Sequence, residues 1–492
     1  MKRFSVLSFL FVSCLFVTSL FGKEQKVEEP LPTIITGTVI GKEFDEIVLN
    51  VFDKISPNDQ YNTYKERIDF DGNFRFVIHS YDVARSYISL GETNNVCEIY
   101  LLSGDDLDLQ IEYEFGEEKP VITFNGKWNS IQKFFIELDE KFPFDNEYFE
   151  HFYYSKNYKK SKRYWNNWRD KQLDFHDQYF RGSALPQVAV DEALNKIQYE
   201  WAFSRTYYIL FHHFWAIDAE PIKLDGHDYD YLKEIKFNNP DAKYSYKYRK
   251  FLNLYGNLLY WRAEKQLDSL PDFEQRNNGF YDLAVEDAEG VARDIIIAGR
   301  LNEAMRGVTS RESLSEIKKI LDKFKILSDS NDYYQNTMEV YNKRLDLMPG
   351  IPAYNFTLND LEGNLVKLSD FKGKIVYIDF WSIGCSPCMK EIPYANKLLK
   401  NLEDVSDDIV FLSINTNYGQ ADRVRNFVAK RNIPGVHLIS SLKTNKKLKK
   451  EFMLSGNPHY LLIDRDGSML NANMTRPSMN KTEIEIRAAL GK

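Results

Sequence analysis

The sequence predicts a multidomain protein with a small antiparallel β domain, an all-α middle region and a C-terminal α/β domain. Its 492 residues exceed the length of one ordinary domain. Short strand-like runs separated by turn residues occupy 33–125, and helical spacing of apolar residues occupies 129–345. Over residues 349–492, strand-like and helical segments alternate. That alternation is typical of an α/β domain.

Residues 1–22 have the pattern of a secretory signal peptide. Lys2 and Arg3 precede an almost wholly apolar run that ends at Phe21, and charged residues follow. We expect cleavage and export to the periplasm or cell envelope. An uncleaved membrane anchor is an alternative, because the apolar run approaches spanning length. A lipoprotein attached through Cys14 is a further one.

The β region is predicted from short runs with alternating apolar residues. Examples are 46–51, 74–78 and 107–111, and turn signals lie at 71–73 and 103–106. A small antiparallel sandwich or barrel is the expected arrangement.

The helical region is predicted from apolar stripes at helical spacing, one over 131–138 and another over 314–327. The aromatic residues crowded into 148–168 are interpreted as packing between helices. No metal site is expected at His212 and His213, because adjacent residues point in different directions around a helix. A break at 349–352, Pro-Gly-Ile-Pro, separates this region from the C-terminal domain.

Composition and cysteine usage exclude several classes of function. The formal net charge is −8, so the chain lacks the basic surplus of a nucleic-acid-binding protein. Without Cys14, the mature chain retains Cys97 and a close pair, Cys385 and Cys388. Such sparse cysteines do not make a disulfide scaffold. Cys97, in a strand-like run, is expected to be a structural thiol.

The close pair has the spacing and surroundings of a redox site. A β-branched and aromatic run at 374–381 predicts a buried strand, and residues 389–401 predict a helix. Cys385 would lie at the helix N-terminus, where unpaired N–H groups and the helix dipole favour a thiolate. Pro387 suits the first turn.

The motifs around this pair carry a resemblance to a known family. The run 381–393, Trp-Ser-Ile-Gly-Cys-Ser-Pro-Cys-Met-Lys-Glu-Ile-Pro, resembles the active-site signature of the thioredoxin superfamily, and its Cys-x-Pro-Cys-x-x-Glu-x-Pro part resembles extracytoplasmic TlpA/ResA-type oxidoreductases. Residues 356–374 resemble that family's opening hairpin, and 456–464 its cis-proline strand. The resemblance covers 349–492. Gly384 departs from it, since the family usually carries a bulkier residue there.

This resemblance implies an extracytoplasmic thiol-disulfide oxidoreductase that reduces protein disulfides and takes electrons from an upstream thiol donor, without a bound cofactor. Cys385 is expected to attack and Cys388 to resolve the mixed disulfide. Asp379 and Glu391 are expected to accept or relay the proton of Cys388. The residues expected to lie beside the substrate are Pro458, Asn457 and Trp381.

Two other interpretations compete with this one. In the first, the protein is a thiol peroxidase. Ser382 fits the hydroxyl position of the peroxiredoxin motif, but Ile378 stands where that motif has proline. In the other, the protein is a secreted partner-binding protein, and the cysteine pair only stabilises its fold.

Overall fold

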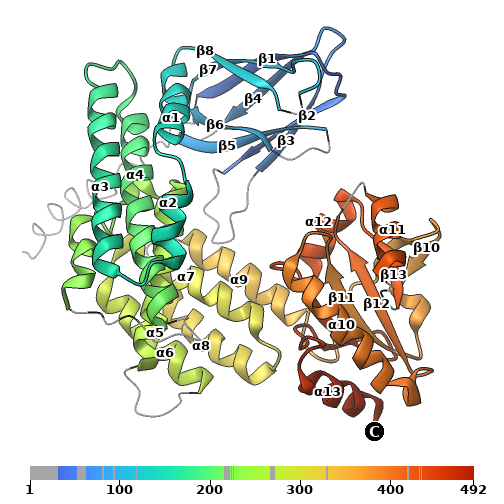
Figure 1. Cartoon of the computed structure of the whole chain (residues 1–492). Coiled ribbons are helices and arrows are strands. Elements are labelled where there is room, and N and C mark those ends of the chain that lie inside the picture. The colour runs from blue at the N-terminus through green and yellow to red at the C-terminus, as the bar shows by residue number, and fades with distance from the viewer. Residues whose placement is uncertain are drawn as a thin grey trace, which may run out of the picture.

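The computed structural model describes residues 31–52, 62–79, 83–91, 95–117, 119–214, 222, 224, 226–265, 272–328, 331–417, 420–431, 433 and 435–492. The predicted signal peptide therefore lies outside the described residues. Figure 1 shows a β-sandwich and a set of helices beside each other, and a separate C-terminal α/β domain. The three predicted parts are thus present in the predicted order. No helix within the described residues combines the length and apolar character needed to cross a bilayer.

The N-terminal part is a sandwich of two four-stranded sheets, ordered β4-β1-β7-β8 and β3-β2-β5-β6. Alternate residues of β4 and β7 are buried, so one face of each strand enters a shared core that includes Phe76 and Leu109. Pairing is antiparallel except between β1 and β7, which run parallel. The strands are β1 (Pro32–Ile40), β2 (Glu46–Val51), β3 (Asn62–Arg67), β4 (Asn73–His79), β5 (Val83–Leu90), β6 (Asn95–Leu102), β7 (Asp106–Glu112) and β8 (Val121–Gly126).

The middle part consists of helices packed around one large apolar core. The aromatic residues within 148–168 are not all buried. Tyr148, Trp165 and Trp168 are buried, whereas Tyr154 is exposed. The α-helices are α1 (Asn129–Lys141), α2 (Asn146–Phe149), α3 (Tyr158–Tyr179), α4 (Gln187–Ile209), α5 (Tyr246–Lys265), α6 (Phe273–Asp287), α7 (Gly290–Gly307), α8 (Arg311–Leu327) and α9 (Asn331–Leu345). The described residues of this part also form two π-helical segments, η1 (Glu150–Tyr154) and η2 (Leu210–Phe214), and two 3₁₀ segments, η3 (Gly226–Glu234) and η4 (Pro240–Ala242).

The sandwich is joined to the helices through β6 and α1. Tyr100 and Leu102 of β6 share an apolar cluster with Phe135 of α1. Gln132 of α1 accepts a hydrogen bond from the Tyr100 backbone N–H at 2.9 Å and donates to the Tyr100 carbonyl. This pairing satisfies the backbone of β6 as a neighbouring strand would.

The C-terminal part is a seven-stranded sheet ordered β10-β9-β13-β12-β11-β14-β15, with β11, β12 and β13 parallel. The central strand β11 is buried along almost its whole length, as its β-branched and aromatic sequence predicts. The elements are β9 (Thr357–Asp360), β10 (Leu365–Lys367), η5 (Leu368–Phe371), β11 (Ile375–Trp381), α10 (Ser386–Asn401), η6 (Glu403–Val405), β12 (Ile409–Asn415), α11 (Ala421–Arg431), β13 (Val436–Ile439), α12 (Leu442–Glu451), β14 (His459–Ile463), β15 (Met469–Asn471) and α13 (Asn480–Leu490).

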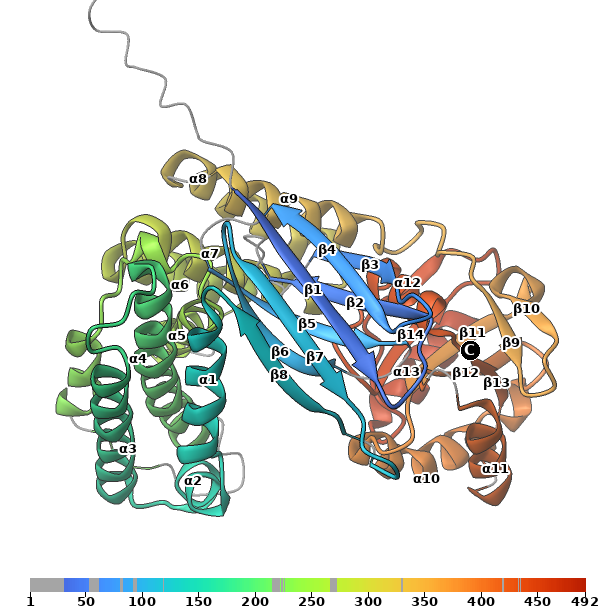
Figure 2. The same cartoon turned by 90° about the horizontal axis from the view of Figure 1, so that it is seen from above.

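The end of α9 connects the helical part to the C-terminal domain. Figures 1 and 2 both place these two parts on opposite sides of the molecule, with α9 between them. Lys343 of α9 forms an ion pair with Glu451 of α12, and Leu347 packs in the core of the C-terminal domain. Arg344, only 1% exposed, has no hydrogen-bond partner for Nε or Nη2, and its burial lowers its pKa to about 10. Burial lowers the pKa of the His459 imidazole, and the charge of Arg344 contributes to the same shift.

Candidate active site

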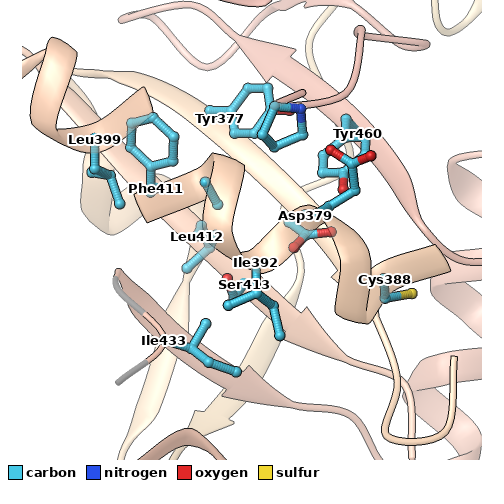
Figure 3. A pocket seen from close by; sticks show the side chains of 13 residues that line it. Tyr377, Asp379, Cys388, Ile392, Leu399, Phe411, Leu412, Ser413, Ile433 and Tyr460 are labelled. Atoms are coloured by element: carbon cyan, nitrogen blue, oxygen red, sulfur yellow. The ribbon is translucent and has the colours of Figure 1, made fainter. Parts of the chain in front are cut away.

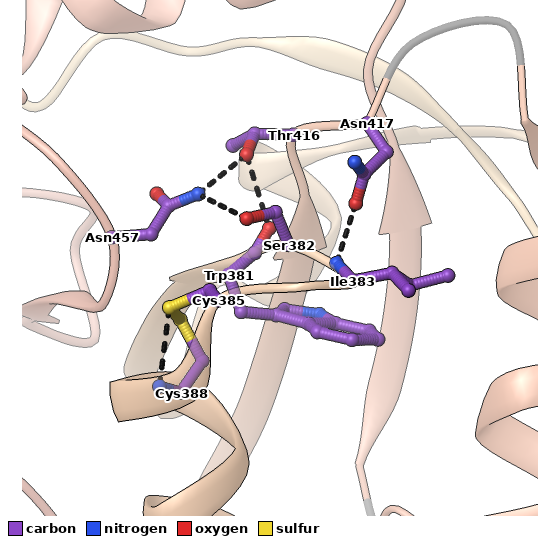
Figure 4. Close-up of a disulfide and its surroundings, with 8 residues drawn as sticks. All are labelled: Trp381, Ser382, Ile383, Cys385, Cys388, Thr416, Asn417 and Asn457. Carbon is purple, nitrogen blue, oxygen red and sulfur yellow. Dashed lines mark hydrogen bonds between the residues drawn. A yellow bond between two sulfur atoms is a disulfide. The ribbon is translucent and has the colours of Figure 1, made fainter. Parts of the chain in front are cut away.

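The two cysteines lie where the buried strand β11 turns into α10, and they form a disulfide with a Cα–Cα distance of 5.3 Å. Cys385 is the N-cap residue, and the backbone N–H of Cys388 donates to its Sγ at 3.1 Å (Figure 4). Cys385 is half-buried, whereas Cys388 is 4% exposed. The sulfur of Cys385 is therefore the more accessible of the two.

Gly384, where the sequence departs from the family pattern, has a backbone conformation that suits glycine. Its φ angle of +90° lies in the left-handed region, which residues with a Cβ atom rarely adopt. No atom lies within 4 Å of a Cβ placed there. The constraint at this position is therefore conformational, and the surface before Cys385 is open.

Asp379 is enclosed on the same side of the sheet as Cys388. Figure 3 shows its carboxyl group close to Tyr460 and Ser413, facing the helix that carries Cys388. Although the residue as a whole is partly exposed, Oδ1 is fully enclosed and accepts no hydrogen bond. Burial, with a further contribution from the charge of Glu391, raises the pKa of Asp379 to about 7.

Glu391 is placed differently, although it lies one helical turn after Cys388. It is 8% exposed, and Ser478 donates to both of its oxygens: the backbone N–H to Oε2 and the hydroxyl to Oε1, each at 2.9 Å. Asp379, Glu391 and Cys388 all line one cavity of about 30 Å³. The two predicted carboxyl groups and the buried sulfur are thus brought together.

The loop before β14 approaches the disulfide with a cis peptide bond between Asn457 and Pro458. The side-chain amide of Asn457 donates to Ser382 Oγ at 3.1 Å and to Thr416 Oγ1 at 2.7 Å (Figure 4). Thr416 in turn donates its backbone N–H to the Trp381 carbonyl at 2.9 Å. The ends of β11 and β12 and the cis-proline loop are therefore fixed to one another.

Trp381 lies beneath the site. It is 3% exposed and shares an apolar cluster with Cys388 and Val424, and its ring centroid lies 5.8 Å from that of Phe427. These contacts make Trp381 a packing residue in the oxidised form. They leave little of its surface for a substrate.

Three residues of the site were missed by the sequence analysis. Ser478 holds Glu391, Thr416 holds Asn457, and Asn417 Oδ1 accepts from the Ile383 backbone N–H. Each lies far along the chain from its partner and belongs to no local motif. The sequence predicts a strand over 409–416. Only the position of Thr416 as its last residue, at the sheet edge where β11 also ends, could have drawn attention to it.

Other candidate sites give no comparable arrangement. Within the described residues, no group of three or more His, Cys, Asp or Glu side chains is placed to hold a metal ion. His212 packs on Tyr208, and Nδ1 of His213 lies 2.7 Å from the Ile222 carbonyl. Cys97 is the free cysteine among the described residues; it packs against the sandwich core, and its burial raises its pKa to about 12.

A pair of cysteines at a helix N-terminus, next to a cis-proline loop on a thioredoxin-like sheet, defines a class of redox proteins. Comparison with known sequences finds relatives of this chain in the same class. The redoxin family profile matches residues 348–487. Thiol-disulfide oxidoreductase ResA of Bacillus thuringiensis strain Al Hakam is 34% identical over 122 residues, which is 25% of this chain and 66% of that protein. ResA of Bacillus subtilis strain 168 is 31% identical over 132 residues, 27% of this chain and 70% of that protein. The chain belongs to the redoxin family, among its ResA-type thiol-disulfide oxidoreductases.

Among solved structures, a putative thiol-disulfide oxidoreductase from Bacteroides vulgatus is similar. It is 34% identical, with 29% of this chain and 98% of that chain covered and a TM-score of 0.27. The curated relatives above are matched over roughly two thirds of their own length and about a quarter of this chain.

Proposed function

We propose that this protein is an exported thiol-disulfide oxidoreductase that reduces disulfide bonds of proteins in the periplasm or cell envelope. The observation that carries the proposal is the pairing of a half-buried Cys385 with a buried Cys388 beside two carboxyl groups. A disulfide that only stabilised the fold would not need titratable groups around its inner sulfur. Export is supported by the apolar run that follows Lys2 and Arg3.

In the proposed reaction, the Cys385 thiolate attacks one sulfur of a substrate disulfide and expels the other as a thiolate. Cys388 then loses its proton to a nearby carboxylate and attacks the sulfur of Cys385. This step releases the second substrate thiolate and leaves Cys385 and Cys388 oxidised to the disulfide. An upstream thiol donor returns two electrons to the pair. No bound cofactor is required, because the two sulfurs carry both electrons.

The substrate is proposed to lie along the cis-proline loop. The Asn457–Pro458 bond is cis, and we expect it to turn the backbone of Asn457 toward the cysteines, where it can pair with an extended segment as an added strand would. Pro458 lies next to that segment. Asn457 is suited to this role because Ser382 and Thr416 hold its side chain, which leaves its backbone presented in a fixed orientation.

A redox titration tests the proposal. The full-length protein is equilibrated with glutathione buffers of increasing oxidised fraction, and the state of Cys385 and Cys388 is measured by thiol alkylation and mass spectrometry. We expect a single two-electron transition and catalytic reduction of a protein disulfide such as that of insulin. A pair that stays oxidised throughout would instead support the partner-binding alternative.

A further inference from the structure

Two rows of aromatic side chains meet at one end of the helical part. Phe149 and Tyr153 stack with ring centroids 6.0 Å apart, and Phe203, Tyr207 and Phe211 form a second stacked row with centroids 6.0 and 5.9 Å apart. Tyr153 joins the rows, because its ring centroid lies 5.6 Å from that of Phe211. We call the following residues the aromatic surface: Phe149, Tyr153, Tyr154, Phe203, Tyr207 and Phe211.

The aromatic surface is open to solvent. Tyr154 is 72% exposed, Phe149 and Tyr153 are also exposed, and the second row is half-buried. Tyr153 and Tyr154 lie on η1 and Phe211 lies on η2, and π-helical segments of this kind recur at functional sites. A contiguous exposed apolar patch on a folded protein indicates a binding surface.

A basic run follows the aromatic surface along the chain. Residues 155–164 contain five basic side chains and no acidic one, in a protein whose net charge is −8, and over 145–163 basic residues still outnumber acidic ones by five to three. Burial lowers the pKa values of His151 in η1 and His212 in η2, and the charges of Lys160 and Lys156, respectively, contribute. The basic run therefore lies beside both π-helical segments. Its members are Lys156, Lys159, Lys160, Lys162 and Arg163, all of them exposed except the half-buried Lys162.

We propose that the aromatic surface and this basic run bind the surface of a bilayer that contains anionic phospholipid. Lysine and arginine side chains attract the anionic headgroups, and tyrosine rings are favoured at the boundary between headgroups and acyl chains. The charge alone would suit an acidic protein as well. Exposed aromatic rings flanked by long basic side chains, however, match the two layers of a bilayer surface.

The binding surface is already assembled in the folded protein. The Tyr208 hydroxyl at the end of α4 donates to the Ser155 carbonyl at 2.6 Å, and its ring stacks on that of Tyr158 at the start of α3, with centroids 5.3 Å apart. Figures 1 and 2 place α3 and α4 on the side of the helical part that faces away from the C-terminal domain. A bilayer bound there leaves the redox centre uncovered. This inference goes beyond the proposed function and needs no chemistry at the two cysteines.

Vesicle flotation tests the proposal. The mature chain without residues 1–22 is mixed with vesicles of phosphatidylcholine, with or without phosphatidylglycerol, because the apolar run of the signal peptide would itself enter lipid. We expect the protein to float only with the vesicles that contain phosphatidylglycerol, and to be released by high salt, which screens the attraction. Equal flotation with both kinds of vesicle, or with neither, would overturn the proposal.

Charge variants locate the binding surface. Replacing Lys156, Lys159 and Lys160 together by Gln should weaken binding about a hundredfold, since each basic side chain near an anionic surface strengthens binding about fivefold. Replacing the same three residues by Arg should leave binding unchanged. The matched control replaces three exposed lysines of α12, a helix without aromatic residues, and should bind like the wild type; these are Lys446, Lys449 and Lys450. Equal weakening by the α12 variant would mean attraction to any basic helix and would overturn the proposed surface.

A second variant tests the aromatic rings. Phe149→Ser combined with Tyr154→Ser removes two exposed rings and should weaken binding about tenfold, because binding strength scales with the apolar area that enters the bilayer. Undiminished binding would show that the rings take no part. Thermal unfolding of every variant should match that of the wild type, so that a loss of binding is not a loss of fold.

Discussion

Asn457 Nδ2 donates a hydrogen bond to Thr416 Oγ1 at 2.7 Å and so links the cis-proline loop to the end of β12, although the two residues are 41 positions apart. The same amide reaches Ser382 between β11 and the cysteines. The loop expected to bind substrate and the loop that carries the nucleophile are thus fixed by one side chain.

This link predicts that Asn457→Ala slows disulfide reduction but lowers the stability of the fold only slightly. Removing the amide takes one donor from the Ser382 hydroxyl and one from the Thr416 hydroxyl, which still donates to the Trp381 carbonyl, and should cost about 1 kcal/mol of stability. We expect a higher KM for a protein disulfide and little change with a small disulfide such as oxidised glutathione. Steady-state kinetics and thermal unfolding measure both effects, and Asn396→Ala, at an exposed position of α10, is the control. Equal losses with both substrates would contradict a role in holding an extended polypeptide.

The unequal exposure of the two sulfurs predicts different trapping behaviour. Cys388→Ser should stop at the mixed disulfide and retain protein partners in a form that dithiothreitol releases. Cys385→Ser should retain few, because its remaining thiol is 4% exposed. Non-reducing gels of native extracts, with mass spectrometry of the adducts, check the result and identify substrates. Equal trapping by the two variants would mean that nucleophile and resolver are wrongly assigned.

The enclosed carboxyl group of Asp379 predicts a gain in stability when it is replaced. A carboxyl group whose pKa is raised from 3.8 to about 7 is held more tightly as the acid in the folded protein, so folding loses stability as the pH rises through this window. Asp379→Asn should therefore raise the free energy of unfolding at pH 8 by up to about 4 kcal/mol and leave it unchanged near pH 3.

The same variant should be a poor enzyme. If Asp379 accepts the proton of Cys388, Asp379→Asn should slow release of the mixed disulfide at pH 7 by at least about tenfold. Denaturant unfolding at the two pH values and single-turnover kinetics provide the measurements. A release rate near that of the wild type for both Asp379→Asn and Glu391→Gln, between pH 6 and pH 9, would show that neither carboxyl group takes part.

The C-terminal domain is predicted to fold and to exchange disulfides without the two domains that precede it. The stability of such a fragment should depend on the residue at which it begins. Leu347 packs in the core of this domain, and the Gly350 N–H donates to the Met469 carbonyl at 2.9 Å. A fragment 346–492 should therefore be more stable than 349–492, which lacks Leu347, by about 2 kcal/mol. Trp381, the only tryptophan in either fragment, reports unfolding by fluorescence. A folded 346–492 fragment without activity on insulin would mean that the helical region completes the site.

Sequence analysis predicted the features whose residues lie close together along the chain and missed those whose residues lie far apart. The strand before Cys385, the helix after it and the nearby carboxyl groups Asp379 and Glu391 lie within one stretch, where spacing alone brings them together. The partner of Glu391 is 87 positions away, and no periodicity connects a serine before α13 with a glutamate in α10. The parallel pairing of β1 with β7 was equally out of reach, since the alternation within a strand determines its buried face but not its neighbour.

Arg344, at the end of α9, affects how firmly the redox domain is held. Water would restore the hydrogen bonds that Nε and Nη2 lack, so hydration of this guanidinium partly offsets the cost of separating the domain from the helices. The Lys343–Glu451 ion pair opposes separation only modestly, because neither side chain is fully buried. The joint is therefore held mainly by apolar packing: Leu347 is buried in the core of the C-terminal domain and Met348, the next residue, in the core of the helices, so separating the two parts would expose one of these side chains.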